Sequence, residues 1–227
     1  MNRASVSTTM PRPWTEGAGS TEHTIRSGSA IFEQGAPVTH VQLVLEGVLL
    51  EQSRVDGRVV LVGLRGPGCL PGMMAAILGR RHITSAIAFG ESVIESMPIG
   101  EFHRLRRLDP GCSAWLQDMQ ARESRDELRR LHLWIAADCG ERLDQLLVQL
   151  VALSGEDRTD GSLKLTLPLE VEKLAGLAAV RRETASRHLG RRIKDGTLRK
   201  QNGWFFVPSA SDLMPRVRAE RARMLTL

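Results

Sequence analysis

The feature that most constrains the fold of this chain is a change of hydrophobic pattern at Pro98. From about residue 24 to residue 98, short apolar runs alternate with turns containing glycine or proline, which is typical of an antiparallel sandwich or barrel. Beyond Pro98, apolar residues recur every three or four positions, as in amphipathic helices. The sequence therefore predicts an α+β protein in which a β domain precedes a helical part.

The β domain is predicted over residues 24–108, after a lead-in over 1–23 whose Ser, Thr, Pro and Gly content predicts disorder. Asp56-Gly57 separates two β-branched runs and predicts a type I′ hairpin turn, because both central residues of that turn need positive φ. Met73–Leu78 is predicted as a short helix between strands. The runs predicted as strands are Ala30–Phe32, Val41–Leu45, Val48–Gln52, Val59–Leu64, Thr84–Phe89 and Val93–Met97.

One long helix is predicted over Cys112–Ala137, within a dimerisation segment over 109–137. Cys112, Trp115 and Met119 form one face, which is suited to packing on the β domain. A second stripe follows a 3-4-3-4 spacing that produces one continuous seam. A dimer seam and an ordinary amphipathic helix covering its own core are equally open interpretations of that stripe. The seam residues are Ala121, Ser124, Leu128, Leu131 and Ile135.

The last predicted domain spans residues 138–227 and begins at a break around Asp138-Cys139-Gly140. It ends in two short helices with a tight connection and a basic hairpin, the pattern of a winged helix-turn-helix. Its predicted elements are, in order, a helix over Glu141–Leu153, a polar loop over 154–161, a strand over Leu163–Leu167, helices over 171–178 and 181–195, and a hairpin turning at Asn202-Gly203.

The second of the two short helices carries the chemistry that indicates a function. Ala185, Leu189 and Ile193 are spaced to face the core, and a polar group lies on the opposite side near the helix start. Arginine can donate two hydrogen bonds to guanine, and glutamate can accept one from cytosine N4. A central carboxylate contributes nothing to a helix that binds only phosphates or a membrane. The predicted base-reading residues are Arg182, Glu183, Ser186 and Arg187.

The charge distribution supports a polyanionic partner. The net charge is +5 and the sequence pI is about 9.7. Residues 181–200 hold eight basic residues against two acidic ones. Such a block suits nucleic acid or an anionic membrane surface, although a solvated face that binds nothing is the commoner meaning of a charge run. Membrane association is not expected, because no apolar run approaches the roughly 18–20 residues of a membrane helix.

The stretch LAGLAAVRRETASRHLGRRIKDGTLRKQNGWFFV resembles the DNA-binding end of the Crp/Fnr family of transcription regulators. Its core, RETASR, matches the family's R-E-T-x-x-R and E-T-x-S-R forms. More weakly, IFEQGAPVTHVQLVLEGVLLEQSRVDGRVVLVGLRGPG resembles the family's β-roll, and AADCGERLDQLLVQL resembles its hinge and following helix. The resemblance covers roughly residues 24–207. It implies an N-terminal jelly-roll-like β-roll that acts as a sensor, a long dimerisation helix and a C-terminal winged helix-turn-helix.

The resemblance also implies how such a chain meets DNA. Arg182, Glu183 and Arg187 are expected to read a half-site containing a GA step, with Ser186 adding a contact. A homodimer along the long helix is expected to bind a palindromic site in double-stranded DNA. The loop over 155–161 falls where activating relatives touch RNA polymerase. Phosphate contacts, which set orientation but not sequence, are expected from Arg181, Thr184, Arg199 and Lys200.

Several positions depart from the family pattern. The turn position usually held by glycine is Ala179, and the position before R-E-T, often a Ser or Thr N-cap, is Arg181. The places where the cyclic-nucleotide branch holds ribose and phosphate carry residues 71–74 and 84–85, without a guanidinium or a carboxylate. Cyclic AMP is therefore not the expected effector, and both an unknown small molecule and loss of effector control stay open. The candidate pocket residues are Met73, Met74, Thr84, Ser85 and Leu128.

No cofactor, metal site or catalytic residue is predicted. The three cysteines are far apart and show no zinc-ligand or iron–sulfur spacing, which fits a reducing cytoplasm. Haem stays open, because Cys69, His82 or His132 can each supply an axial ligand. The alternative function is a small-ligand or haem-sensing module whose C-terminal helices serve protein contacts. An enzyme on the β scaffold needs a His/His/Glu cluster, and His40 and His82 are isolated.

Overall fold

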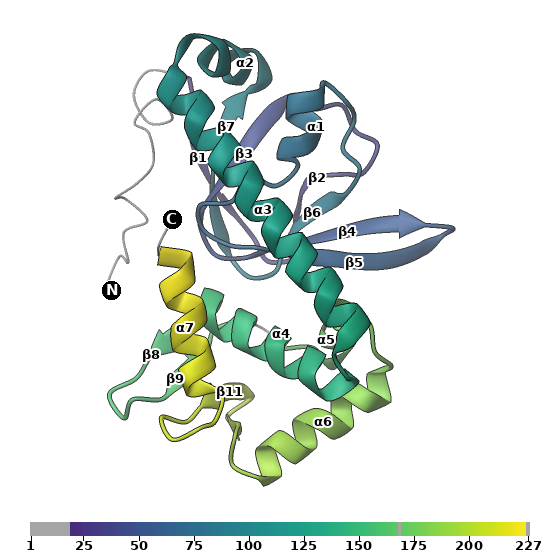
Figure 1. Cartoon of the computed structure of the whole chain (residues 1–227), viewed down its shortest axis with the longest axis vertical. Helices are drawn as coiled ribbons and strands as arrows, with labels where there is room; N and C mark the ends of the chain where they lie inside the picture. Colours follow the sequence, from purple (N-terminus) through teal and green to yellow (C-terminus); the bar gives the residue numbers. More distant parts are fainter. Residues whose placement is uncertain (1–18, 168, 226–227) are drawn as a thin grey trace. The chain divides into compact units, whose positions relative to one another are not determined.

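The structure, a computed structural model, describes residues 19–167 and 169–225. The chain divides after Leu128 into two compact units. The first contains two antiparallel sheets, and the second contains one antiparallel sheet among helices (Figure 1). The long helix α3, Pro110–Ala136, begins in the first unit and ends in the second.

The strands of the first unit agree with the six predicted runs. They form sheets of order β1-β7-β3 and β2-β6-β4-β5, in which every pair is antiparallel. Asp56 and Gly57 have φ of 48° and 75°, as the predicted hairpin turn requires. The short helix α1, Met73–Leu78, is present. The strands are β1 Thr21–Ile25, β2 Ala30–Phe32, β3 His40–Glu46, β4 Leu49–Val55, β5 Arg58–Arg65, β6 Ser85–Ala88 and β7 Ser92–Pro98.

Strand β1 corrects part of the predicted disordered lead-in over 1–23. Residues 1–18 lie outside the described residues, but Thr21–Ile25 pairs with β7, from Thr21 opposite Ser96 to Ile25 opposite Ser92. The prediction was wrong here because the β1 side chains are mostly exposed, so the strand lacks the apolar alternation of a half-buried strand. Main-chain hydrogen bonds hold this edge strand without a side-chain pattern.

The core of the first unit lies where α1, α2 (Ile99–Leu108) and the first turns of α3 pack together with β3 and β7. Cys112 is buried in this core, and Trp115 and Met119 pack against it, which confirms the predicted inner face of the long helix. The helix begins two residues earlier than predicted. Proline is tolerated at a first helical position, and the Cys112 amide donates a hydrogen bond to the Asp109 side chain at 3.0 Å.

The second unit begins its own fold at Asp138, where a break was predicted. The Asp138 carboxylate accepts hydrogen bonds from the amides of Gly140 and Glu141 at 2.6 and 2.9 Å, which caps α4. The predicted loop over 154–161 is partly wrong, because Gly155–Asp157 pairs with the next strand. The elements are α4 Cys139–Ser154, β8 Gly155–Asp157, β9 Leu163–Leu165, α5 Val171–Leu177, α6 Arg182–Lys194, β10 Arg199–Gln201, β11 Trp204–Val207 and α7 Met214–Leu225, with sheet order β10-β11-β9-β8.

Candidate nucleic-acid interface

Helix α6 separates a buried side from a charged exposed side. Ala185 and Leu189 are buried as predicted, but Ile193, also predicted to face inward, is 37% exposed. His188 is also buried, because it lies three residues after Ala185 on the inner side of the helix and has a polar partner beneath it. All four predicted base-reading residues lie on the exposed side: Arg182, Glu183, Ser186 and Arg187.

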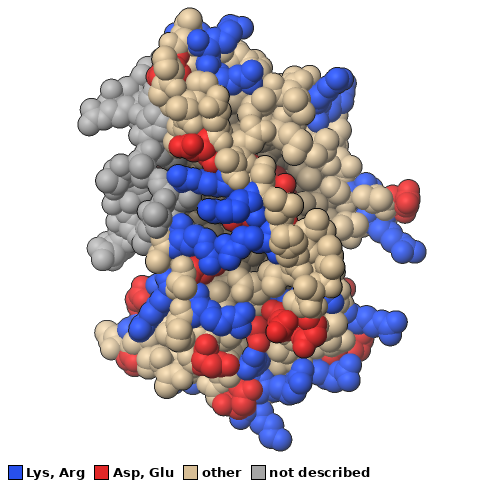
Figure 2. Space-filling view, in the orientation of Figure 1, with Lys and Arg blue, Asp and Glu red and all other residues tan. Residues whose placement is uncertain are grey.

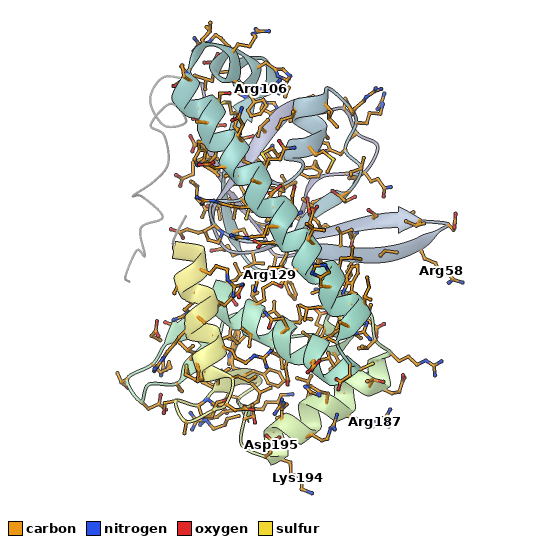
Figure 3. The ribbon with its side chains drawn as sticks, viewed as in Figure 1. Arg58, Arg106, Arg129, Arg187, Lys194 and Asp195 are labelled. Atoms are coloured by element: carbon orange, nitrogen blue, oxygen red, sulfur yellow. The ribbon has the colours of Figure 1, made fainter. Side chains whose placement is uncertain are left out.

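Basic side chains dominate the surface around α6. Lys and Arg side chains gather over this helix in the space-filling view (Figure 2). Arg187 and Lys194 project outward from α6 in the stick view (Figure 3). The exposed carboxylate of Glu183 lies within this positive surface, so the helix offers both donors and an acceptor to the groove of a duplex.

Two of the predicted base-reading residues make only weak contacts within the chain. The Arg182 Nε lies 3.4 Å from Glu172 Oε2 on α5, and both side chains are largely exposed. The Arg187 Nε donates to the Glu183 carbonyl oxygen at 3.4 Å. An exposed ion pair contributes about 0–1 kcal/mol, so the contact of Arg182 can be exchanged for a contact to DNA at little cost.

The turn between α5 and α6 contains a residue in a left-handed conformation. Ala179 has φ of 51°, where glycine is the usual residue. The Ala179 amide donates to the Gly176 carbonyl, and the Val180 amide donates to the Ala175 carbonyl, which is the Schellman pattern. The turn therefore follows the usual path and carries the strain of a Cβ in that path.

The predicted phosphate contacts lie at two ends of this surface. Arg181 is the N-cap residue of α6 and makes no side-chain capping bond, as its side chain predicts, and Thr184 is half-buried in the first turn. Arg199 and Lys200 are exposed on β10. Strands β10 and β11 form a hairpin that turns at Asn202 and the adjacent glycine with positive φ, which is the predicted wing.

The wing sheet presents aromatic rings beneath cations. The Lys164 Nζ lies 4.4 Å from the centre of the Trp204 ring, and Arg199 lies over Phe206. Arg199 also lies 3.3 Å from Asp160 Oδ2. The hydrogen bonds from Ser162, together with Arg199, lower the pKa of Asp160 to about 2, so this carboxylate is charged at neutral pH. These residues line a shallow polar groove on the wing.

Comparison with known proteins identifies both units. Residues 22–109 match the cyclic nucleotide-binding domain family, and residues 141–214 match the Crp-like helix-turn-helix domain family. A CRP-like cAMP-activated global transcriptional regulator of Mycobacterium tuberculosis is 25% identical over 192 residues, which cover 84% of this chain and 85% of the relative. The chain belongs to the Crp/Fnr family of transcription regulators.

Solved structures of Crp/Fnr regulators share the fold. The structure of FixK2 from Bradyrhizobium japonicum matches with a TM-score of 0.73 at 19% identity, covering 88% of this chain and 96% of that chain. A CRP-family transcriptional regulator from Thermus thermophilus matches with a TM-score of 0.71 at 17% identity, with coverages of 88% and 96%. These matches confirm the predicted fold, and membership of a regulator family confirms that the chain is not an enzyme.

The predicted seam of this Crp/Fnr chain is exposed along α3. Leu128, Leu131 and Ile135 are 55%, 46% and 76% exposed, and Ala121 and Ser124 are exposed at least in part. An ordinary amphipathic helix that covers its own core buries such a stripe. Among the described residues, no helix is long and apolar enough to cross a bilayer.

The predicted effector residues do not share one environment. Met73 belongs to the buried core, whereas Met74 and Leu128 are about half exposed. Thr84 is buried, and the Ser85 hydroxyl accepts a hydrogen bond from the Gln34 amide at 2.9 Å. Even Met73 and Met74, which are neighbours on one short helix, thus lie in different surroundings.

The three candidate haem ligands differ in the same way. Burial raises the pKa of the Cys69 thiol to about 11, which disfavours the thiolate that binds iron. The His82 ring stacks on Phe32 with ring centres 3.8 Å apart, and burial lowers its pKa. His132 is exposed on α3. Within residues 19–167 and 169–225, no three His, Cys, Asp or Glu side chains come together as a metal site requires.

Sequence reasoning missed a buried polar group beneath α6. Asp144 on α4 is 5% exposed and accepts hydrogen bonds from His188 and Arg192. The histidine beside the predicted core residue Leu189 was the available signal, because an imidazole that becomes buried needs a partner. The sequence did not indicate which residue supplies that partner, because Asp144 lies 44 positions away.

Proposed function

We propose that this chain is a homodimeric regulator that reads a palindromic DNA site through α6 and responds to an effector other than cyclic AMP. The observation that carries the proposal is the exposed face of α6, where Arg182, Glu183, Ser186 and Arg187 stand opposite a buried side. Arginines that pair with guanine and a glutamate that accepts from cytosine support a half-site with a GA step.

The exposed seam of α3 supports the homodimer. An apolar stripe of Leu128, Leu131 and Ile135 in water is unfavourable, and a second copy of the same helix covers it by a twofold contact. A twofold dimer carries two recognition helices related by the same axis, which accounts for a palindrome. The segment that connects β8 and β9 lies within the loop expected to touch RNA polymerase. Contact with RNA polymerase at this segment is part of the same proposal.

The charges inside the β-roll disfavour a cyclic phosphate. The Arg65 guanidinium at the end of β5 is largely buried, and its Nη2 is 2.8 Å from Glu51 Oε2 and 3.6 Å from Glu127 Oε1 on α3. An anionic ligand has to displace these carboxylates to reach it. Cyclic AMP is therefore expected to leave the melting temperature of the chain unchanged, and a rise of several degrees at millimolar nucleotide contradicts this part of the proposal.

Binding-site selection from a random duplex pool tests the DNA-binding proposal. The purified full chain is expected to recover a palindrome whose half-sites contain a GA step, with half-site centres about one helical turn apart. Recovery of unrelated sequences overturns sequence-specific binding. Recovery of a single half-site without a palindrome leaves specific binding intact and overturns the homodimer.

The two classes of contact on this surface predict different mutant behaviour. Arg187→Ala is expected to lose roughly 1–3 kcal/mol of discrimination at one base pair of the selected site. Lys200→Ala is expected to weaken all duplexes about equally and to lower the slope of log affinity against log salt by about 1. Titrations of the selected and scrambled duplexes at several salt concentrations measure both effects. Equal losses of Arg187→Ala on both duplexes contradict its base-reading role.

A further inference from the structure

A single buried carboxylate holds α6 at two points. The Asp144 Oδ1 atom is 2.7 Å from His188 Nε2 and 3.0 Å from Arg192 Nε, and Arg192 Nη2 bonds Oδ2. Because an ionised carboxylate only accepts hydrogen bonds, His188 donates through a protonated Nε2. The carboxylate therefore collects three hydrogen bonds from two residues of the same helix.

The spacing of these donors fixes the orientation of the helix. His188 and Arg192 are four residues apart, so they lie one above the other on one side of α6. Two donors stacked along the axis and held by one acceptor resist both rotation about the axis and sliding along it. At about 100° per residue, that side lies about 180° from the centre of the base-reading residues. A rotation of α6 about its axis therefore moves every base contact.

Two apolar side chains of α6 are buried. On its inner side Ala185 offers one methyl group and Leu189 one full side chain, whereas Ile193 is partly exposed. Arg192 also reaches Asp212 at 3.4 Å, in the segment that precedes α7. The polar contacts thus join α6 to α4 and to the segment before α7, and they supply directional constraints that the burial of two apolar side chains does not.

We propose that Asp144 is a positioning residue for DNA recognition, which sets the rotation of α6 through His188 and Arg192 and so aligns its base-reading face. The proposal rests on sequence-specific binding by α6. Asp144 does not touch DNA in this scheme. Its contribution lies in the discrimination between sequences, because phosphate contacts tolerate small rotations whereas bidentate base contacts do not.

A charge-neutral replacement separates positioning from folding. The variant Asp144→Leu/His188→Leu/Arg192→Met removes one negative and one positive charge and fills the space with apolar side chains. Buried ion pairs replaced in this way often keep or gain stability, so the full-length variant is expected to fold. The ratio of its affinities for the selected and a scrambled duplex is expected to fall about tenfold or more, as for the loss of one bidentate contact. The salt slope on the scrambled duplex is expected to stay unchanged.

Two single variants complete the experiment. Asp144→Asn keeps one acceptor oxygen and is expected to lower the affinity ratio for the selected and scrambled duplexes, by less than the triple variant does. Glu220→Gln removes the carboxylate that pairs with Arg223 on α7, and it serves as a control with an unchanged ratio. If the triple variant does not fold, Asp144→Asn serves as the test. An unchanged ratio of its affinities for the selected and scrambled duplexes overturns the proposal.

The possible failures are distinct. A wild-type chain that selects no sequence overturns the DNA-reading function itself. A wild-type chain that selects a sequence, beside a folded triple variant with the same affinity ratio, overturns the positioning role alone. If the triple variant loses affinity for both duplexes equally, Asp144 has a purely structural role. That result also overturns the positioning role.

Discussion

Both units of the molecule pair an arginine with a buried carboxylate, and the two clusters differ in how completely they are paired. In the DNA-binding unit, Arg192 and His188 satisfy both oxygens of Asp144. In the β-roll, Arg65 pairs with Glu51, but Oε1 of the neighbouring Glu123 is buried and receives no hydrogen bond from any described residue. A fully paired cluster fixes geometry, whereas an incompletely paired one is poised to bind a proton.

The pKa values of Arg192 and Glu123 shift according to how completely each cluster is paired. The hydrogen bond from Arg192 to Asp144, reinforced by the charge of that carboxylate, raises the pKa of Arg192, so that arginine stays charged. Burial raises the pKa of Glu123 to about 7, and the charges of Glu51, Glu127 and Asp126 add to the effect while Arg65 opposes it. Glu123 therefore changes charge near neutral pH on the helix that carries the seam.

The largest expected effect comes from breaking the paired cluster. Asp144→Ala leaves the buried His188 and the charged Arg192 without their acceptor, and it is expected to lower the free energy of unfolding by about 3–5 kcal/mol. Urea denaturation of the full chain measures the loss. The charge-neutral triple variant is the matched control, since it removes all three partners together. A loss below about 1 kcal/mol for Asp144→Ala shows that the carboxylate is not essential to the unit.

The paired cluster also marks the limit of prediction from sequence. The strands around Asp56-Gly57, the seam of α3 and the exposed face of α6 follow from local periodicity and turn chemistry, which neighbouring residues determine. The partner of His188 and the strand β1 depend on pairing between distant segments, for which one sequence carries no local signal. Ile193 was misjudged for the same reason, because helical spacing predicts a side of the helix but not how far the neighbouring core extends.

The incompletely paired cluster predicts a pH effect of intermediate size. Unfolded, Glu123 titrates near 4.5, and folded it titrates near 7, so between these values the folded state binds more protons than the unfolded state. The free energy of unfolding therefore falls as pH rises from about 4.5 to 7. Glu123→Gln is expected to remove that slope and to stabilise the chain by about 1–3 kcal/mol at about pH 8. Urea unfolding between about pH 5 and 8 measures it.

The control for this prediction is an exposed carboxylate of the same unit. Glu91→Gln is expected to leave both the pH slope and the stability at mildly alkaline pH unchanged, because Glu91 is exposed. If Glu123→Gln shows the wild-type dependence of the free energy of unfolding on pH, Glu123 does not titrate in this range. The two clusters then do not differ in proton binding.

The smallest expected effect tests whether the turn or the buried carboxylate orients α6. Ala179 has a φ of 51°, so Ala179→Gly is expected to stabilise the chain by about 0.5–1 kcal/mol through relief of the Cβ strain. The neighbouring Ala178 has a φ of −85°, and Ala178→Gly is expected to destabilise the chain by a similar amount. If Asp144 orients α6, relaxing the turn changes stability and leaves the affinity ratio for selected and scrambled duplexes unchanged. A fall of that ratio in Ala179→Gly transfers the orienting role from the buried carboxylate to the strained turn.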